Sequence, residues 1–298
     1  MDTSARTELI TVRDLIRYAV TRFCANQLTF GHGSDNAYDE AVYLVLHTLH
    51  LPPDTLEPFL DARVLRREAA QVLDVVNERV QSRQPAAYLT KEAWLRGRRF
   101  YVDKRVIVPR SPISELLDDG LAPWVADPWA VARALDMCTG SGCLAILAAQ
   151  AFPEAHVDAV DLSPDALEVA ARNVADYDLQ ARVSLHQSNL FDALPPVAYD
   201  VIVCNPPYVN QISMQALPRE FKHEPVMALA GGQDGMDLVR RILDRAPKYL
   251  SQDGIIVLEI GHERPHFEAA FPHLAPMWLE TETTSDHILV LSREQLTT

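Results

Sequence analysis

Four consecutive residues, 205–208 (Asn-Pro-Pro-Tyr), combine groups suited to holding a planar amino group. Two prolines fix φ and remove two backbone donors, so this loop is stiff and its carbonyl groups stay free. The side-chain oxygen of Asn205 and the carbonyl of Pro206 can each accept one N–H bond. Holding both hydrogens of an amino group in this way turns the nitrogen lone pair toward a group to be transferred, and the ring of Tyr208 can pack against the planar group. An ordinary proline-rich turn is the alternative.

A second chemical feature is the glycine-rich turn at 135–142 (LDMCTGSG), which ends an expected strand and opens a helix. Glycines let the backbone turn sharply and approach a ligand closely. Open α/β folds bind ligands at the carboxyl edge of the sheet, where this turn would lie. Asp161 ends the next expected strand, nineteen residues after Gly142. A carboxylate in that position can accept bonds from both hydroxyls of a ribose.

Three interpretations compete for this turn. Residues 140–145 also fit the dinucleotide pattern GxGxxA with an acid about 20 residues further on, and a tight turn with a capping acid needs no ligand. Asp136 argues against a dinucleotide, because its carboxylate would repel pyrophosphate and would suit the ammonium of a methionine moiety. S-adenosylmethionine fits best, with its ribose at Asp161 and its amino acid near Asp136. The loop at 205–208 supports this choice, since Tyr208 can also pack against a sulfonium cation.

The elements that must position these residues alternate between strand and helix from residue 112 onward. This pattern predicts an α/β fold with a mostly parallel sheet and helices on both faces. The last two strands are too close for a crossover helix, so they must form an antiparallel hairpin. We expect strands at 131–136, 156–161, 182–186, 199–204, 254–260, 277–282 and 286–291, and helices at 143–152, 164–177 and 234–250.

The chain before residue 112 has a different period. Apolar residues recur at helical spacing in 9–30, 36–50 and 61–82, with a break at the prolines of 51–54. We therefore expect a small helical domain at 1–85, a β-hairpin linker at 86–111 and the catalytic domain at 112–298. Within the linker, 106–108 is expected to form a third strand.

Charge is spread unevenly along the chain, whose net charge is −14. Residues 111–298 carry 11 basic and 27 acidic residues, whereas residues 91–110 carry seven basic and two acidic ones. The acidic part should repel nucleic-acid phosphates and attract a basic protein partner. Two interpretations stay open for 91–110: a weak contact with RNA, or a solvated strand face, which we favour.

The composition argues against a disordered, membrane-spanning or secreted protein. Hydrophobic residues make up 48% and charged residues 23%, as in ordinary globular proteins. No apolar run reaches the ~20 residues of a membrane helix, and the first ten residues do not resemble a secretory signal. The four cysteines form no CxxC pair and no zinc-ligand pattern, so we expect reduced thiols, no metal and a cytoplasmic protein.

Together these motifs carry a family resemblance that covers nearly the whole chain. The order DxCTGSG, acidic strand end and NPPY resembles class I S-adenosylmethionine-dependent methyltransferases that modify planar amino groups. That fold is Rossmann-like, with a mostly parallel seven-stranded sheet and a terminal antiparallel hairpin. Further residues resemble the protein-(glutamine-N5) methyltransferases: Glu224-Pro225, Ala228-Leu229, Gly231-Gly232, Asp234-Gly235, Asp237 and Leu258-Glu259-Ile260-Gly261-His262.

Two subfamilies compete within that family. Enzymes that modify peptide release factors typically read PRPETE in the interdomain loop, whereas residues 109–115 read Pro-Arg-Ser-Pro-Ile-Ser-Glu. This loop is similar to that of enzymes that modify the third protein of the large ribosomal subunit. We therefore expect methyl transfer to the side-chain N5 of a glutamine in that protein, with release factors as the alternative acceptor. The helical domain would recognise the substrate.

The resemblance assigns roles to named residues. Where family members have Asp at the adenine contact, this chain has Asn189, whose carbonyl oxygen can still bond the adenine amino group. Three rival classes are an adenine-N6 methyltransferase of nucleic acid, an NAD-dependent dehydrogenase and a non-catalytic binding scaffold. The implied catalytic residues are Asn205, Pro206, Pro207 and Tyr208, and the implied cofactor-binding residues are Asp136, Cys138, Thr139, Gly140, Ser141, Gly142, Asp161, Leu162, Asn189 and Leu190.

Overall fold

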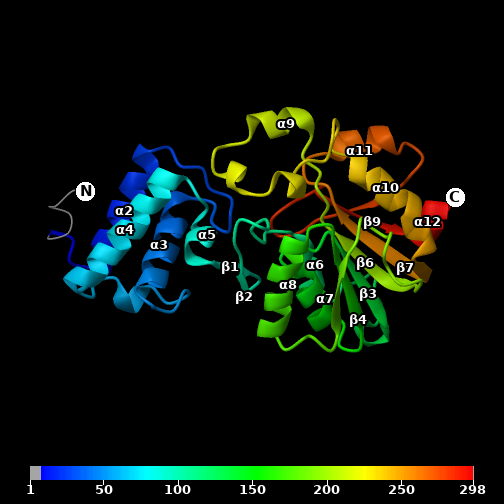
Figure 1. The fold of residues 1–298 in the computed structure, drawn as a ribbon, viewed down its shortest axis with the longest axis horizontal. Coiled ribbons are helices and arrows are strands. Elements are labelled where there is room, and N and C mark those ends of the chain that lie inside the picture. The colour runs from blue at the N-terminus through cyan, green and yellow to red at the C-terminus, as the bar shows by residue number, and fades with distance from the viewer. Residues whose placement is uncertain (1–7, 298) are drawn as a thin grey trace. The chain divides into compact units, whose positions relative to one another are not determined.

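The computed structural model describes residues 8–297, so residues 1–7 and 298 of the predicted domains lie outside the described residues. The chain divides into two compact units (Figure 1). One runs up to Ala93 and includes Pro218–His223, and the other comprises Trp94–Leu217 and the chain from Glu224 onward. This division falls between the predicted boundaries at 85 and 111: residues 86–93 belong to the helical unit, and the rest of the predicted linker belongs to the second unit.

The first unit is helical, as its period predicts. Thr11 and Asp14 form a capping box at the start of its first long helix, and Asn36 caps the next. Apolar side chains at helical spacing form one core, with Leu15, Phe23 and Leu44 fully buried. The helices are α2 (Val12–Ala25), α3 (Ala37–Thr48), α4 (Arg66–Ser82) and α5 (Ala86–Thr90), with a 3₁₀ turn η1 (Glu57–Phe59).

A segment from much later in the chain completes this unit. Glu220 is buried and accepts hydrogen bonds from Arg83 Nη1 at 2.9 Å and from the amide of Thr29 at 3.2 Å. Nearby, the buried Arg79 guanidinium donates to Glu40 Oε1 at 2.8 Å. The helical unit therefore depends on a carboxylate that its own contiguous sequence does not supply.

The hairpin is present where it was predicted, but its expected third strand is not. Strands β1 (Glu92–Leu95) and β2 (Arg98–Tyr101) join through Arg96 and Gly97, both at positive φ. Phe100 is fully buried in the core of the second unit. The prediction of a strand at 106–108 is wrong: Val108 donates its amide to a Glu224 carboxylate at 2.9 Å instead of to a strand partner.

The second unit is built on a seven-stranded sheet in the order β5-β4-β3-β6-β7-β9-β8. All ladders between β5 and β7 are parallel, and β9 is antiparallel to both of its neighbours. This confirms the predicted terminal hairpin. The strands are β3 (Arg133–Met137), β4 (His156–Asp161), β5 (Val183–Gln187), β6 (Tyr199–Cys204), β7 (Leu250–Glu259), β8 (Met277–Leu279) and β9 (Ile288–Ser292).

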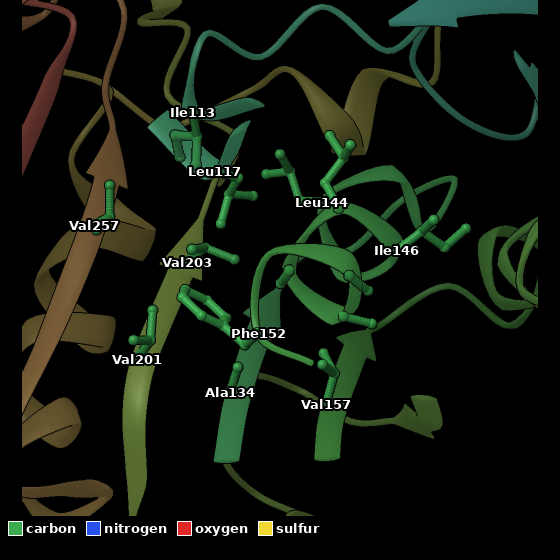
Figure 2. Close-up of a cluster of buried hydrophobic side chains, with 14 of the residues drawn as sticks. Ile113, Leu117, Ala134, Leu144, Ile146, Phe152, Val157, Val201, Val203 and Val257 are labelled. Atoms are coloured by element: carbon green, nitrogen blue, oxygen red, sulfur yellow. The ribbon is translucent and has the colours of Figure 1, made fainter. Parts of the chain in front are cut away.

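Both faces of this sheet are covered. Along β6, Val201 and Val203 belong to one apolar cluster, while Ile202 belongs to the other. Figure 2 shows Val201 and Val203 on the face that helix α7 (Cys143–Ala151) covers, near Phe152. That alternation explains why the strands read as unbroken apolar runs.

Helices cover the two faces in separate groups (Figure 1). The face with Val201 carries α6 (Ile113–Asp118), α7 and α8 (Pro164–Asp176), and the other face carries α10 (Asp237–Arg245), α11 (Arg264–Ala270) and α12 (Arg293–Thr297). Of these, α6, α11 and α12 were not anticipated, and the long predicted helix at 234–250 is α10 followed by a 3₁₀ turn, η5 (Ala246–Lys248). The remaining elements are α9 (Gln211–Ala216), η2 (Pro128–Ala130), η3 (Phe221–His223) and η4 (Val226–Ala228).

The described residues include the basic stretch 91–110 and all four cysteines. Arg96 and Arg98 both pair with Asp118, which favours a solvated, ion-paired face for the basic stretch 91–110. All four cysteines are free thiols, and residues 8–297 contain no cluster of metal-ligating side chains. Within the same residues, no helix combines the length and apolar character that crossing a membrane requires.

Candidate functional site

The turn after β3 is held in a shape that favours glycine. Gly140 and Gly142 have φ of +55° and +81°, and a Cβ on Gly142 would lie 3.1 Å from Cβ of Ala170 in α8. The side-chain amide of Asn173, also in α8, donates to the Ser141 carbonyl at 2.8 Å. The turn can therefore bring β3, α7 and α8 together closely, and Asn173 is a support that the sequence pattern did not reveal.

Asp136 lies on β3 beneath this turn and is 1% exposed. Its Oδ2 accepts the Thr139 hydroxyl at 2.5 Å, while Oδ1 is buried without a hydrogen bond of normal geometry in the described residues. Burial raises the pKa of this carboxyl to about 7, although the Thr139 bond acts in the opposite direction. The Ala145 amide also acts on this carboxylate, and a buried carboxylate with few hydrogen bonds is a suitable contact for a cationic group.

Asp161 is fixed at the end of the neighbouring strand, β4. Its Oδ2 accepts the amide of Gly140 and its Oδ1 the amide of Ser163, both at 2.9 Å. Burial raises the pKa of this carboxyl, and the amide bonds oppose the shift. Each oxygen keeps a further lone pair for a ligand hydroxyl, so the predicted ribose contact is compatible with the geometry.

One cavity brings the two predicted motifs together. Its wall includes Asn205 and Pro207 from the loop after β6, as well as Asp161 from β4. The predicted cofactor residues Cys138, Gly140, Leu162, Asn189 and Leu190 also line it. The other predicted site residues do not line it: Asp136, Thr139, Ser141, Gly142 and Pro206 are buried, and Tyr208 is partly buried. The sequence did not single out Ile107, Met137, Met227 or Leu238, which are apolar lining residues without a chemical signature.

Asn189 already has a partner inside the protein. Its Oδ1 accepts a hydrogen bond from Arg241 Nη2 at 2.9 Å. The next residue, Leu190, has a positive φ of 56°. The oxygen expected to bond adenine is therefore shared with a guanidinium, which orients the carboxamide at the cavity wall.

The loop after β6 is pinned to the stretch that follows Glu224. The amide of Val209 donates to the carbonyl of Leu229, and the amide of Gly231 donates to the carbonyl of Val209, both at 2.9 Å. An added Cβ on Gly231 would lie 2.7 Å from Cα of Tyr208, and one on Gly235 would lie 2.2 Å from the Tyr208 carbonyl oxygen. The glycines of this stretch are thus required because the backbone passes against Tyr208.

Residues 109–115 face into the second unit. Both guanidinium ends of Arg110 donate to Glu224, at 2.6 and 2.8 Å. The hydroxyl of Ser111 donates to Glu259, and Ser111 is 3% exposed. The motif at 258–262 alone suggests no role for Glu259, although Glu259 is the last residue of the apolar strand β7, just as Asp161 is the last residue of β4.

Comparison with known proteins defines the class. The family model described as the methyltransferase small domain matches residues 120–271. A crystal structure of the hMettl16 catalytic domain with a MAT2A 3′UTR hairpin covers 76% of this chain and 81% of that chain, with a TM-score of 0.50 and 16% identity. The fold is that of the class I S-adenosylmethionine-dependent methyltransferases, as predicted.

Full-length relatives define the family within that class. Proteins named ribosomal protein uL3 glutamine methyltransferase match from Bordetella pertussis, at 73% identity over 100% of both chains, and from Burkholderia pseudomallei, at 58% identity over 99% of this chain and 98% of that protein. A third, from Neisseria gonorrhoeae, is 53% identical over 99% of each. The chain belongs to the family of ribosomal protein uL3 glutamine methyltransferases, which confirms the family and the subfamily predicted from the sequence.

Proposed function

We propose that this chain transfers a methyl group from S-adenosylmethionine to the side-chain N5 of a glutamine in ribosomal protein uL3. The observation that carries the proposal is the shared cavity, in which Asn205 and Pro207 lie on the same wall as Asp161 and Gly140. A cofactor bound at the glycine turn would therefore meet a target amide at the proline loop.

The residues beside the cavity fit S-adenosylmethionine. Asp136 offers a buried carboxylate oxygen to the cofactor's ammonium, directly or through water. Asp161 offers lone pairs to the ribose hydroxyls, and Leu162, Asn189 and Leu190 offer apolar and polar contacts to the adenine. When bound, S-adenosylmethionine supplies a methyl group carried on a positively charged sulfur.

The chain's own residues supply position and charge. The Asn205 oxygen and the Pro206 carbonyl accept the two N–H bonds of the target amide, which fixes the direction of its nitrogen lone pair. The ring of Tyr208 packs against the planar amide. No strong base is required, because the amide proton becomes acidic once the nitrogen is methylated and water can take it. The rate gain comes from orientation in a preformed site.

The acceptor is a basic protein because ribosomal proteins bind RNA, and the acidic second unit would attract it. The helical unit is proposed to recognise this acceptor, and the reaction is placed in the cytoplasm, where ribosomal proteins are made. A weak RNA contact at 91–110 is a second, less favoured proposal, because Arg96 and Arg98 are already paired with Asp118.

The test is labelled-methyl transfer with the purified chain, uL3 and a peptide release factor in parallel, followed by intact-mass measurement. We expect one added methyl group on uL3 and little or none on the release factor. An acceptor in which the modified glutamine is replaced by glutamate is the matched control. Efficient transfer to the release factor with none to uL3 would move the acceptor assignment to the alternative.

A further inference from the structure

Tyr208 is attached to a buried chain of hydrogen bonds that the proposed mechanism does not use. Its hydroxyl donates to Glu259 Oε1 at 2.9 Å, and the other oxygen of Glu259, Oε2, accepts the hydroxyl of Ser111. Glu259 and Ser111 are 4% and 3% exposed. A buried carboxylate with both oxygens bonded to hydroxyls is a rigid support, because loss of either bond leaves a polar group without a partner.

Ser111 is itself fixed at the start of α6. Its oxygen accepts the amide of Ile113 at 3.3 Å, and its carbonyl accepts the amide of Ser114 at 3.1 Å. The hydroxyl hydrogen is therefore left to point at Glu259. The chain Ser111–Glu259–Tyr208 links the residue that follows Arg110 to the aromatic ring of the proline loop.

Packing restricts the same ring. Gly261 has φ of +53°, and an added Cβ there would lie 2.5 Å from Cε2 and 3.0 Å from Cζ of Tyr208. The end of β7 thus contacts Tyr208 twice: Glu259 holds its hydroxyl, and Gly261 leaves room for its ring. A ring fixed at both places cannot rotate without breaking its hydrogen bond to the buried Glu259, and it directly follows Pro207, which lines the cavity.

We propose that Glu259 and Ser111 are positioning residues for methyl transfer, because together they hold the Tyr208 ring where the target amide meets the methyl donor. This inference rests on the proposed function, and it adds two residues that do not touch either substrate. It requires Glu259 to be ionised, since only a carboxylate accepts from both hydroxyls without donating a proton itself.

The surroundings of Glu259 make that ionisation dependent on pH. Burial raises its pKa to about 7, while bonds from Ser111 and Tyr208 and the positive charge of Arg110 lower it. Arg110 is itself paired with Glu224, and Cys204 faces Glu259 from β6. Protonation below pH 7 converts Glu259 into a donor, so one of its two hydroxyl bonds is lost or reversed.

The first test compares Glu259→Gln, Tyr208→Phe and the double variant with the wild type at pH 8. We expect kcat to fall about tenfold or more in Glu259→Gln, with the acceptor KM and the affinity for S-adenosylhomocysteine within about twofold. The double variant should be no slower than Tyr208→Phe, because in this proposal Glu259 acts on the reaction through the Tyr208 hydroxyl, which the Phe variant lacks. Glu268→Gln, at an exposed glutamate of α11, is the matched control and should keep the wild-type rate.

The second test is a pH profile of kcat at saturating cofactor. The wild type should lose activity as the pH falls through about 7, and Glu259→Gln should show a flat profile in the same range. The inference is overturned if Glu259→Gln keeps kcat within about twofold of the wild type, or if the two single effects multiply in the double variant. Loss of S-adenosylhomocysteine binding would show that Glu259→Gln does not fold. In that case the wild type alone decides, and the inference is overturned if its kcat does not fall as the pH drops below about 7.

Failure of the proposed function has a different outcome. In that case the wild type itself transfers no methyl group to a protein glutamine at any pH. An active wild type with an equally active Glu259→Gln variant contradicts only the positioning role.

Discussion

Asp136 and Glu259 lie in different strands of the sheet, and each is almost completely buried, at 1% and 4% exposure. Burial raises the pKa of both carboxyl groups to about 7. Their partners differ. Asp136 Oδ1 lacks a hydrogen bond of normal geometry in the described residues, whereas both oxygens of Glu259 accept hydroxyl groups.

Asp136 and Glu259 therefore have different roles, although burial raises the pKa of both. A desolvated carboxylate with few hydrogen bonds is stabilised when a cation approaches it, so Asp136 is suited to ligand binding. A carboxylate whose oxygens are both bonded belongs to the scaffold, so Glu259 is suited to holding another side chain. Binding and positioning are therefore separated by hydrogen-bond satisfaction, and the predictions below probe that separation.

The largest effect is expected where a buried carboxylate is paired with a full charge. Glu40 is 2% exposed, and its side chain bonds the fully buried Arg79. Arg79→Met leaves Glu40 buried without its cation, and should lower the free energy of unfolding by about 3–5 kcal/mol. Urea denaturation measures this loss.

The control for that change is the exposed pair of Arg13 and Asp61, at 58% and 83% side-chain exposure. Arg13→Met should shift the urea midpoint far less than Arg79→Met, because exposed ion pairs contribute little. Equal losses in the two variants would contradict the role assigned to burial.

The next prediction concerns Asn205, which should affect binding of the target amide but not binding of the cofactor. Asn205→Ala removes the carboxamide that orients the target amide, and should slow methyl transfer at least ~100-fold, the loss typical of one oriented polar contact. Affinity for S-adenosylhomocysteine should stay close to that of the wild type. Single-turnover kinetics and calorimetry measure the two quantities, and near-normal turnover would exclude the carboxamide-clamp mechanism.

Asp161 provides the reverse case on the cofactor side. Asp161→Ala should weaken binding of S-adenosylhomocysteine by about 1.5–3 kcal/mol, as expected for hydrogen bonds to a charged group. Calorimetry with S-adenosylhomocysteine and NAD in parallel measures it. Tighter binding of NAD by the wild type would refute the cofactor assignment.

The pH dependence of binding tests Asp136 directly. Its pKa in the folded protein is raised to about 7 by burial, and a bound ammonium favours the ionised form. Binding below pH 7 must therefore displace a proton, and affinity for S-adenosylhomocysteine should fall by up to about tenfold per pH unit. Asp136→Asn should bind more weakly and show no such slope. Equal wild-type affinity at pH 8 and pH 5.5 would contradict the contact between Asp136 and the ammonium of the ligand.

The smallest effect concerns surface charge. Residues 111–298 carry a net charge of −16, and exposed charges are screened by salt far more than buried ones. The kcat/KM for intact uL3 should fall several-fold, or about half a log unit, between low and physiological ionic strength. A short neutral peptide around the target glutamine should show a weaker dependence, and parallel slopes would remove the role of electrostatic attraction.

Much of the fold is readable from the sequence because apolar strands end in chemically distinctive residues. The predicted strands at 156–161 and 199–204 agree with β4 and β6 at both ends. The strand expected at 106–108 is wrong because this short apolar run belongs to a loop that lines the cavity and bonds to Glu224. The local sequence cannot distinguish a strand from a loop at 106–108, because Glu224, which bonds the loop, lies more than a hundred residues further along the chain.

The candidate site, like the fold, could be predicted only where the chemistry is local in sequence. Asn205, Asp161 and the glycine turn were predicted and do line one cavity, because their chemistry is local. The contacts of Arg241 with Asn189 and of Ser111 with Glu259 depend on tertiary placement, so no spacing rule reveals them. Residues 109–115 distinguish the two subfamilies in sequence, but their pattern does not reveal that Arg110 and Ser111 bond to Glu224 and Glu259 within the second unit.

The segment Pro218–His223 has a consequence for modularity. Because Glu220 bonds Arg83 and Thr29, the helical unit is assembled from two stretches of chain separated by most of the catalytic sequence. A fragment that ends at Ala93 would lack this carboxylate. A single crossover after the helices would pair Arg83 with the Glu220 segment of another family member, so exchange of the whole helical unit requires two crossovers.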